Sequence, residues 1–133
     1  MLSLLEELNY HNEGLSHILI LNGGRISSSS TDNTLIIYNK NTFKPDIIIE
    51  HLNYVNYFIQ LRNTNIVTCS CDHTSRIIQL FPKKKYKIIQ TLKEHTDKVT
   101  KAIELEDGKL LTVGDDKFII VGNKIQRTII YMK

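Results

Sequence analysis

Three histidines and three aspartates recur in this sequence with one fixed spacing. Each histidine precedes an aspartate by 21 residues, in the pairs His11 and Asp32, His51 and Asp72, and His95 and Asp116. A hydroxyl residue stands four positions before each aspartate, at Ser28, Thr68 and Thr112. Three identical offsets indicate an internal repeat of about 40 residues, in which each unit buries its apolar faces against its neighbours.

Each repeat contains four short segments of β-branched and apolar residues, separated by turn residues. The segments expected as strands are 15–21, 25–30, 34–39 and 43–49, then 55–61, 66–70, 75–80 and 86–92, then 99–105, 110–113, 118–121 and 125–131. The Asn-Gly-Gly sequence at 22–24 favours a hairpin turn, and Pro82 cannot extend a ladder. We therefore expect an all-β chain of three four-stranded antiparallel blades, in repeats 11–49, 51–92 and 95–131, with the period of a β-propeller.

The first eight residues fit the repeat as the outer strand of a blade that the chain does not contain. Three apolar residues stand seven, six and three positions before both the first and the third repeat histidine: Leu4, Leu5 and Leu8, and Ile88, Ile89 and Leu92. Residues 1–8 are therefore expected to form an extra N-terminal outer strand, followed by a partial propeller in the form of an open arc.

Three blades are fewer than the four to eight, roughly, with which propellers close, so an open arc leaves two sheet faces exposed. Two interpretations account for these faces. The chain is a fragment of a longer propeller, or two copies associate into a closed six-bladed ring. The surplus outer strand favours the fragment. We expect the isolated chain to be an aggregation-prone monomer or a mixture of oligomers that associate through the open faces.

Composition suits one soluble domain over residues 1–133, with 41% hydrophobic and 23% charged residues. We expect no signal peptide and no membrane span, because the N-terminus lacks a basic region and no apolar run reaches about 18 residues. The net charge of +3 comes partly from the lysine run at 83–85, which a solvated turn explains. Cys69 and Cys71 stand too close in one strand to pair easily, which indicates a reducing compartment, cytoplasmic or nuclear.

The repeats resemble those of the tryptophan-aspartate (WD) repeat β-propellers over almost the whole chain. The shared pattern is His-x-x-x-Leu/Val, then a strand of small or hydroxyl residues, then Asp-x-Thr in two copies. In that family a histidine, a hydroxyl residue, an aspartate and a tryptophan form a hydrogen-bonded cluster inside each blade. The resemblance implies three such clusters: His11 with Ser28 and Asp32, His51 with Thr68 and Asp72, and His95 with Thr112 and Asp116. The tryptophan positions hold Tyr38, Ile78 and Gly122, and the chain has no tryptophan.

The same residue types also form the catalytic triad of hydrolases. A catalytic site is needed once, whereas this trio recurs three times, so we expect a structural role and no catalytic residue. Cys69, Cys71 and His73 beside Asp72 offer ligand atoms for a metal, but Cys-x-Cys is not the usual spacing of a zinc site. We expect buried cysteines and no metal. The turn at 22–24 lacks the following helix of a phosphate-binding loop, so no cofactor is expected.

The resemblance implies a non-catalytic scaffold or adaptor that binds partner proteins through the propeller rim. The candidate rim positions lie three and six residues after the repeat histidines and directly before the aspartates: His17, Thr31, Tyr54, Tyr57, Cys71, Lys98, Lys101 and Asp115. Their mixed chemistry names no particular partner. A propeller enzyme is the competing class, and it would need one polar cluster or metal site unlike the others.

Single-stranded nucleic acid is an alternative ligand for the same region. Aromatic residues that stack on bases and lysines that bind phosphates are present at 54–58 and at 98–101. We expect Phe58 to face the sheet core, and a protein partner accounts for the tyrosines equally well. The expected partners are therefore other proteins.

Overall fold

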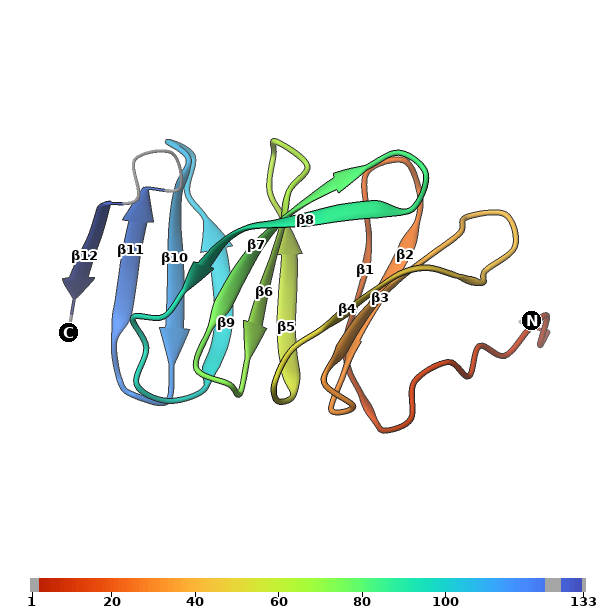
Figure 1. The fold of residues 1–133 in the computed structure, drawn as a ribbon, viewed down its shortest axis with the longest axis horizontal. Helices are drawn as coiled ribbons and strands as arrows, with labels where there is room; N and C mark the ends of the chain where they lie inside the picture. Colours follow the sequence, from red (N-terminus) through yellow and green to blue (C-terminus); the bar gives the residue numbers. More distant parts are fainter. Residues whose placement is uncertain (1–2, 124–127, 133) are drawn as a thin grey trace.

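The computed structural model describes residues 3–123 and 128–132 of the chain. Within this part the chain contains no helix and forms three four-stranded antiparallel sheets, each with its strands in sequence order (Figure 1). No described residue belongs to a helix long and apolar enough to cross a membrane. The prediction of an all-β arc of three blades is confirmed.

The strand bounds follow the repeats. The first blade contains β1 (Leu15–Ile20), β2 (Ile26–Ser30), β3 (Thr34–Tyr38) and β4 (Pro45–Glu50). The second contains β5 (Val55–Gln60), β6 (Ile66–Ser70), β7 (Ser75–Phe81) and β8 (Lys85–Leu92). The third contains β9 (Val99–Glu104), β10 (Lys109–Gly114), β11 (Ile119–Asn123) and β12 (Thr128–Met132). β1, β5 and β9 are the inner strands and lie side by side along the arc (Figure 1).

Most strand ends lie close to their predicted positions, and β4 differs for an identifiable reason. The Asn39 side chain accepts hydrogen bonds from the backbone N–H groups of Asn41 and Thr42, at 2.9 and 3.0 Å. The Asn39 carbonyl accepts another from the N–H of Phe43, which adopts a left-handed φ of 56°. The loop therefore extends past residue 43, where the strand was expected to begin. Residues 125–127 of the expected last strand lie outside the described part.

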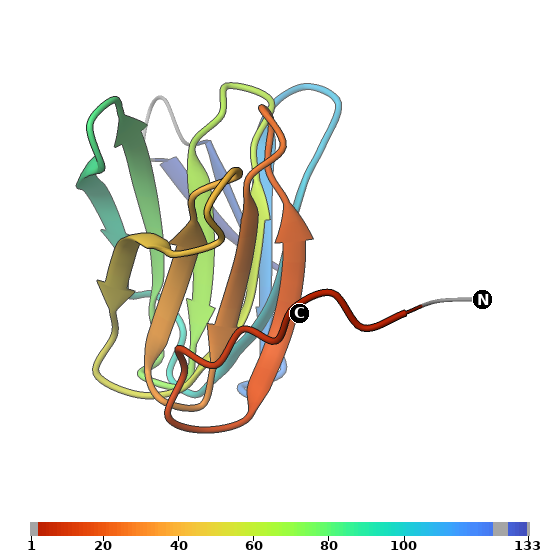
Figure 2. The same ribbon diagram turned by 90° about the vertical axis from the view of Figure 1, so that its right-hand side faces the viewer.

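The structure differs from the expectation of an outer strand over residues 1–8. Residues 3–14 have no regular secondary structure, and the N-terminal segment projects away from the sheets (Figure 2). Leu4 and Leu5 are 77% and 95% exposed. A strand needs a neighbour to pair its backbone groups, and the blade to which this stretch would belong has no other strand among the described residues. Tyr10 lies 6.1 Å from Tyr38, measured between ring centroids.

The apolar core lies at the two junctions between neighbouring blades. At the first junction the buried cluster consists of Leu21, Leu35, Ile37, Ile47, Ile49, Phe58, Ile66 and Ile78. At the second it consists of Leu61, Val67, Cys69, Ile77, Val99, Ala102 and Leu110. Each fully buried large aliphatic or aromatic side chain stabilises the fold by about 1.5–3 kcal/mol. Packing of one blade on the next therefore holds the arc together.

The hairpin between β7 and β8 reaches from the second blade toward the first (Figure 1). Pro82 lies in its turn as predicted, followed by Lys83 and Lys84 at φ angles of 65° and 63°. The Nζ of Lys84 lies 3.5 Å from Asp46 Oδ1 of β4. Because this lysine is largely exposed, the ion pair contributes little stability. Lys83 and Lys84 therefore lie in an exposed turn, and Lys85 begins β8.

Candidate functional site: blade clusters and rim

The first blade contains a chain of four hydrogen-bonded side chains. The Nδ1 atom of His11 lies 2.9 Å from Asp32 Oδ2, and its Nε2 atom lies 2.7 Å from Ser28 Oγ. Ser28 Oγ lies 2.9 Å from the hydroxyl of Tyr38, which stands at the tryptophan position of the family. The imidazole, the serine and the tyrosine are all buried. Tyrosine thus supplies the polar group that an indole N–H would supply.

The other two clusters repeat the geometry of the first three members. His51 Nδ1 lies 2.9 Å from Asp72 Oδ2 and its Nε2 lies 2.7 Å from Thr68 Oγ1. His95 Nδ1 lies 2.8 Å from Asp116 Oδ2 and its Nε2 lies 2.9 Å from Thr112 Oγ1. Ile78 and Gly122 hold the tryptophan position there and have no side-chain polar group to continue the chain. The structure therefore brings together every trio that the spacing selected.

The carboxylates determine where the protons of these clusters lie. Burial would raise the pKa of Asp32, but the Thr34 hydroxyl, the backbone N–H of Asn12 and the imidazole of His11 outweigh burial and lower the pKa to about 2. An ionised carboxylate can only accept, so the histidine Nδ1 must carry the hydrogen. In the tautomer with its hydrogen on Nδ1, the Nε2 lone pair of His11 accepts from the hydroxyl of Ser28. The hydrogen bonds of this chain are then all donated in one direction: from Tyr38 to Ser28, from Ser28 to His11, and from His11 to Asp32.

The carboxylates of the second and third clusters are also ionised at neutral pH. For Asp72, hydrogen bonds from Thr74 and His51 overcome burial and lower the pKa to about 2. The pKa of Asp116 is also lowered, because hydrogen bonds from Phe118 and His95 overcome burial. Burial lowers the pKa of His51 and outweighs the opposite effect of its carboxylate partner. This imidazole is therefore neutral near pH 7, as an acceptor of the threonine hydroxyl must be.

The cluster hydroxyls are out of reach of a substrate. Ser28, Thr68 and Thr112 are 2%, 0% and 3% exposed. A hydrolase nucleophile must approach a carbonyl carbon, which a hydroxyl residue with almost no exposed surface cannot do. In the described part of the chain, no three or more His, Cys, Asp or Glu side chains are grouped as metal ligands.

Both cysteines are free and buried. Burial raises the pKa of Cys69 to about 12, so this thiol is neutral and a poor nucleophile. Cys71 is 7% exposed, and its Sγ lies 3.2 Å from Asn56 Oδ1. Cys71 therefore presents almost no surface to a partner, in contrast to its expected place on the rim.

The other candidate rim residues differ in exposure. Tyr54, Lys98, Lys101 and Asp115 are exposed, and Thr31 is half-buried. Backbone hydrogen bonds join rim residues that are distant in the sequence. The N–H of Asp115 donates to the carbonyl of Lys98 at 2.9 Å. The N–H of Cys71 donates to the carbonyl of Tyr54 in the same way, at 2.8 Å.

His17, Tyr57 and Lys101, all six residues after a repeat histidine, form one stack across the three inner strands. The His17 ring centroid lies 4.3 Å from that of Tyr57, and Lys101 Nζ lies 5.8 Å from the same tyrosine centroid. Burial, with a smaller effect of the lysine charge, lowers the pKa of His17. Both aromatic rings are half-buried, so the stack is a contact between blades as much as a rim surface. The repeat phase places these three residues at one position of the repeat, but the contacts between them follow only from the packing of neighbouring blades.

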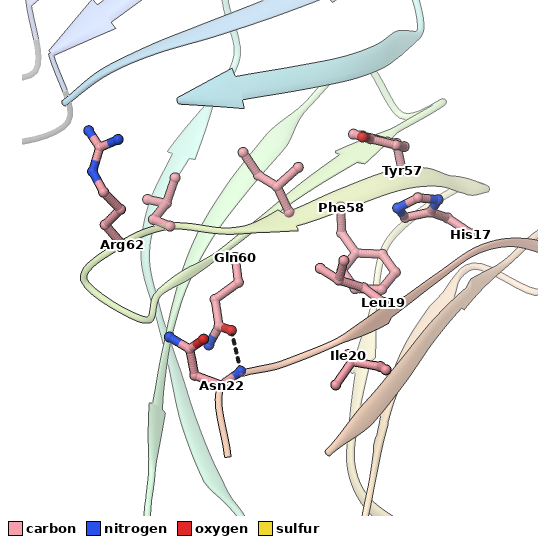
Figure 3. Close-up of a pocket in the computed structure, with 10 residues that line it drawn as sticks. His17, Leu19, Ile20, Asn22, Tyr57, Phe58, Gln60 and Arg62 are labelled. Atoms are coloured by element: carbon pink, nitrogen blue, oxygen red, sulfur yellow. Dashed lines mark hydrogen bonds between the residues drawn. The ribbon is translucent and has the colours of Figure 1, made fainter. Parts of the chain in front are cut away.

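A groove runs between β1 and β5, from His17 and Tyr57 at one end to Asn22 and Arg62 at the other (Figure 3). The backbone N–H of Asn22 donates to Gln60 Oε1 at 2.7 Å, the bond drawn in Figure 3. The next junction repeats this bond, with Arg62 N–H donating to Glu104 Oε1 at 2.9 Å. Sequence reasoning missed these bonds between blades, although the polar residues stand at equivalent repeat positions.

Comparison with solved structures identifies the architecture. The WD40 β-propeller domain of Doa1 has a TM-score of 0.82 and 15% identity over 95% of this chain and 43% of that chain. U3-55K has a TM-score of 0.81 and 13% identity, over 94% of this chain and 41% of that chain. The RRP9 WD40 repeats have a TM-score of 0.79 and 14% identity, over 92% of this chain and 39% of that chain. No protein-family model and no curated protein sequence matches. The fold is that of three consecutive WD40 propeller blades, and the chain spans less than half the length of these structures.

Proposed function

We propose that this chain is part of a non-catalytic WD-repeat scaffold that binds partner proteins through the exposed rim of the propeller. One observation carries the proposal: the His, hydroxyl and Asp trio is enclosed in all three blades, with hydroxyls at most 3% exposed. Buried polar groups that satisfy one another hold each blade in one arrangement. The residues that resemble a catalytic triad therefore stabilise the blades, and we expect the exposed residues to contact the partners.

The exposed rim residues are Tyr54, Lys98, Lys101 and Asp115. Tyr54 is 49% exposed, and aromatic side chains with adjacent charges are frequent anchors of protein interfaces. A base-stacking surface is less well supported, because Tyr57 already contacts His17 and Lys101. Two unpaired thiols favour a cytoplasmic or nuclear scaffold.

Exposed apolar residues on the first blade support a longer propeller around these three blades. Leu15 and Ile18 of β1 are 62% and 65% exposed. Their counterparts in the second blade, Val55 and Phe58, are fully buried, and Phe58 packs with residues of the first blade. Contiguous apolar surface of this kind is typical of an interface. In the proposed scaffold, further blades cover it.

The test is capture of proteins by the purified chain with quantitative mass spectrometry. The rim variant is Tyr54→Ala with Lys98→Ala, and the matched control is Lys85→Ala with Lys87→Ala on exposed β8. We expect a set of proteins that wild type and control retain equally and the rim variant loses by at least about tenfold. Identical sets for all three chains, with unchanged melting temperatures, would contradict the rim as the binding surface.

A further inference from the structure

A second groove lies at the end of the blades opposite the rim. The turn between β1 and β2, the turn between β5 and β6 and the hairpin between β7 and β8 all lie at this end, and residues from each of them line the groove (Figure 1). It meets the groove of Figure 3 at Asn22 and Gln60, which line both. Its volume is about 460 Å³, which falls in the range of ligand sites in proteins.

The walls of this groove are held by the chain itself. Gln60 Oε1 accepts from the N–H of Asn22 at 2.7 Å, and Gln60 Nε2 donates to the carbonyl of Thr64 at 3.0 Å. One amide side chain thus joins the first two turns. The third wall is the β7–β8 hairpin, whose strands contain 7 and 8 residues, whereas β3 and β4 of the first blade contain 5 and 6. This extra length carries the turn at Pro82 toward the first blade.

The side chains that line the groove are mainly basic. Among the described residues, Arg25, Lys83 and Lys84 line it together with one carboxylate, that of Asp46. Asp46 Oδ1 lies 3.5 Å from Lys84 Nζ, so this carboxylate is already paired. In the part of the chain that the structure describes, the side chains of Arg25 and Lys83 have no hydrogen-bond or ion-pair partner. Arg25 is half-buried, and its planar guanidinium has the geometry that binds a carboxylate through two parallel bonds.

Basic residues at the same end of the next junction are paired within the chain. Arg62 donates to two backbone carbonyls of the turn between β9 and β10, and its Nε lies 3.9 Å from Glu104 Oε1. Lys109 stands at the repeat position of Arg25 and lies 2.9 Å from Asp107. The cations of the groove therefore do not follow from the repeat, since at the next junction the repeat accompanies its cations with carboxylates.

Apolar side chains of the β7–β8 hairpin line the same groove. Leu80 is half-buried, Phe81 is 40% exposed, and Pro82 lies in the turn. Cations beside an exposed aromatic ring fit a ligand that carries both carboxylates and an apolar side chain, as an acidic peptide segment does. A nucleic acid carries a charge at every phosphate and would bring some of that charge against Asp46. The composition of the groove therefore favours a peptide.

We propose that this groove binds an acidic peptide segment of a partner protein. One carboxylate of the segment accepts two hydrogen bonds from Arg25, a second lies against Lys83, and an apolar side chain packs on Phe81. This surface lies at the opposite end of the blades from the rim and goes beyond the proposed function. Its test does not depend on the capture experiment for the rim.

The test is fluorescence anisotropy of a labelled peptide of glutamate and leucine residues, compared with one in which glutamine replaces glutamate. The charge variant is Arg25→Gln with Lys83→Gln. The matched control, Lys40→Gln with Lys93→Gln, removes the same charge from exposed lysines outside the groove. We expect wild type and control to bind the glutamate peptide equally, and the charge variant to bind it at least about tenfold more weakly. The glutamine peptide should bind more weakly than the glutamate peptide to wild type.

Two further variants test the lining of the groove. Asp46→Asn removes the carboxylate and releases Lys84 for the ligand, so it should bind the glutamate peptide more tightly than wild type. Phe81→Ser leaves the charge unchanged and should bind more weakly, because it removes the apolar contact. Circular dichroism checks that each variant folds.

Several results would overturn the proposal. Absence of binding by wild type, or equal affinities of the folded charge variant and its control, would refute the groove as an acidic-peptide site. Weaker binding by Asp46→Asn would contradict the electrostatic argument. Single-stranded RNA that binds wild type more tightly than the glutamate peptide, and binds Arg25→Gln with Lys83→Gln more weakly than wild type, would identify a nucleic-acid site instead.

Discussion

Replacing His51 by alanine should destabilise the second blade strongly. The imidazole makes two short hydrogen bonds, at 2.9 Å to Asp72 and at 2.7 Å to Thr68. A bond to an ionised carboxylate contributes about 1.5–3 kcal/mol and a neutral one about 1 kcal/mol. Asp72 keeps hydrogen bonds from the N–H and the hydroxyl of Thr74, at 2.9 and 2.6 Å, and Thr68 keeps a weaker one, at 3.3 Å, from the N–H of Arg76, which reduces the loss. We expect the free energy of unfolding to fall by about 3 kcal/mol.

The assay is urea denaturation followed by circular dichroism, with His17→Ala as the control. His17 is half-buried and stacks on Tyr57 without belonging to a cluster, so its loss should cost about 1 kcal/mol or less. Equal denaturation midpoints for wild type and His51→Ala would refute the structural role. Unchanged stability together with loss of an esterase or peptidase activity would identify a catalytic histidine instead.

Three further outcomes can be measured on the same chain. Tyr38→Phe removes the hydroxyl 2.9 Å from Ser28 and should lower stability by about 1 kcal/mol in urea denaturation; an unchanged midpoint would mean that the tyrosine hydroxyl contributes nothing. Gly114→Ala should destabilise, because a Cβ would lie 2.6 Å from the Lys98 carbonyl oxygen; a melting temperature at or above wild type would contradict this. The aspartates of the first two clusters have a pKa of about 2, below the unfolded value, so their stabilisation is complete above pH 4, roughly, and is lost as the pH falls toward 2. Stability that stays flat between those pH values would contradict the ionised clusters.

Repetition made most of this fold predictable. A histidine spaced 21 residues from an aspartate in three copies fixes the phase of each blade, and every trio selected in this way is hydrogen-bonded in the structure. The turns at residues 22–24 and at Pro82 also follow from local backbone chemistry.

Features that depend on neighbours were harder to predict. The leucines of the N-terminal stretch have the repeat phase of an outer strand, yet no strand of the described part of the chain pairs with residues 3–8. Phe43 is apolar and fits the pattern of a strand, but the Asn39 side chain holds its loop in a turn. The burial of Cys71 depends on its contact with Asn56, which repeat spacing does not encode.

The residues of each cluster are close to one another in the sequence, and this affects how the chain folds. Each cluster joins side chains 17 and 21 residues apart, all within one blade. Closing a loop of this length costs little conformational entropy compared with contacts across the whole chain. A blade can therefore assemble its own polar network before its neighbours dock. In repeat proteins, the stability is the sum of a term for each unit and a term for each contact between neighbouring units. Folding of this arc should propagate from blade to blade, with the order of events set by which junction closes first.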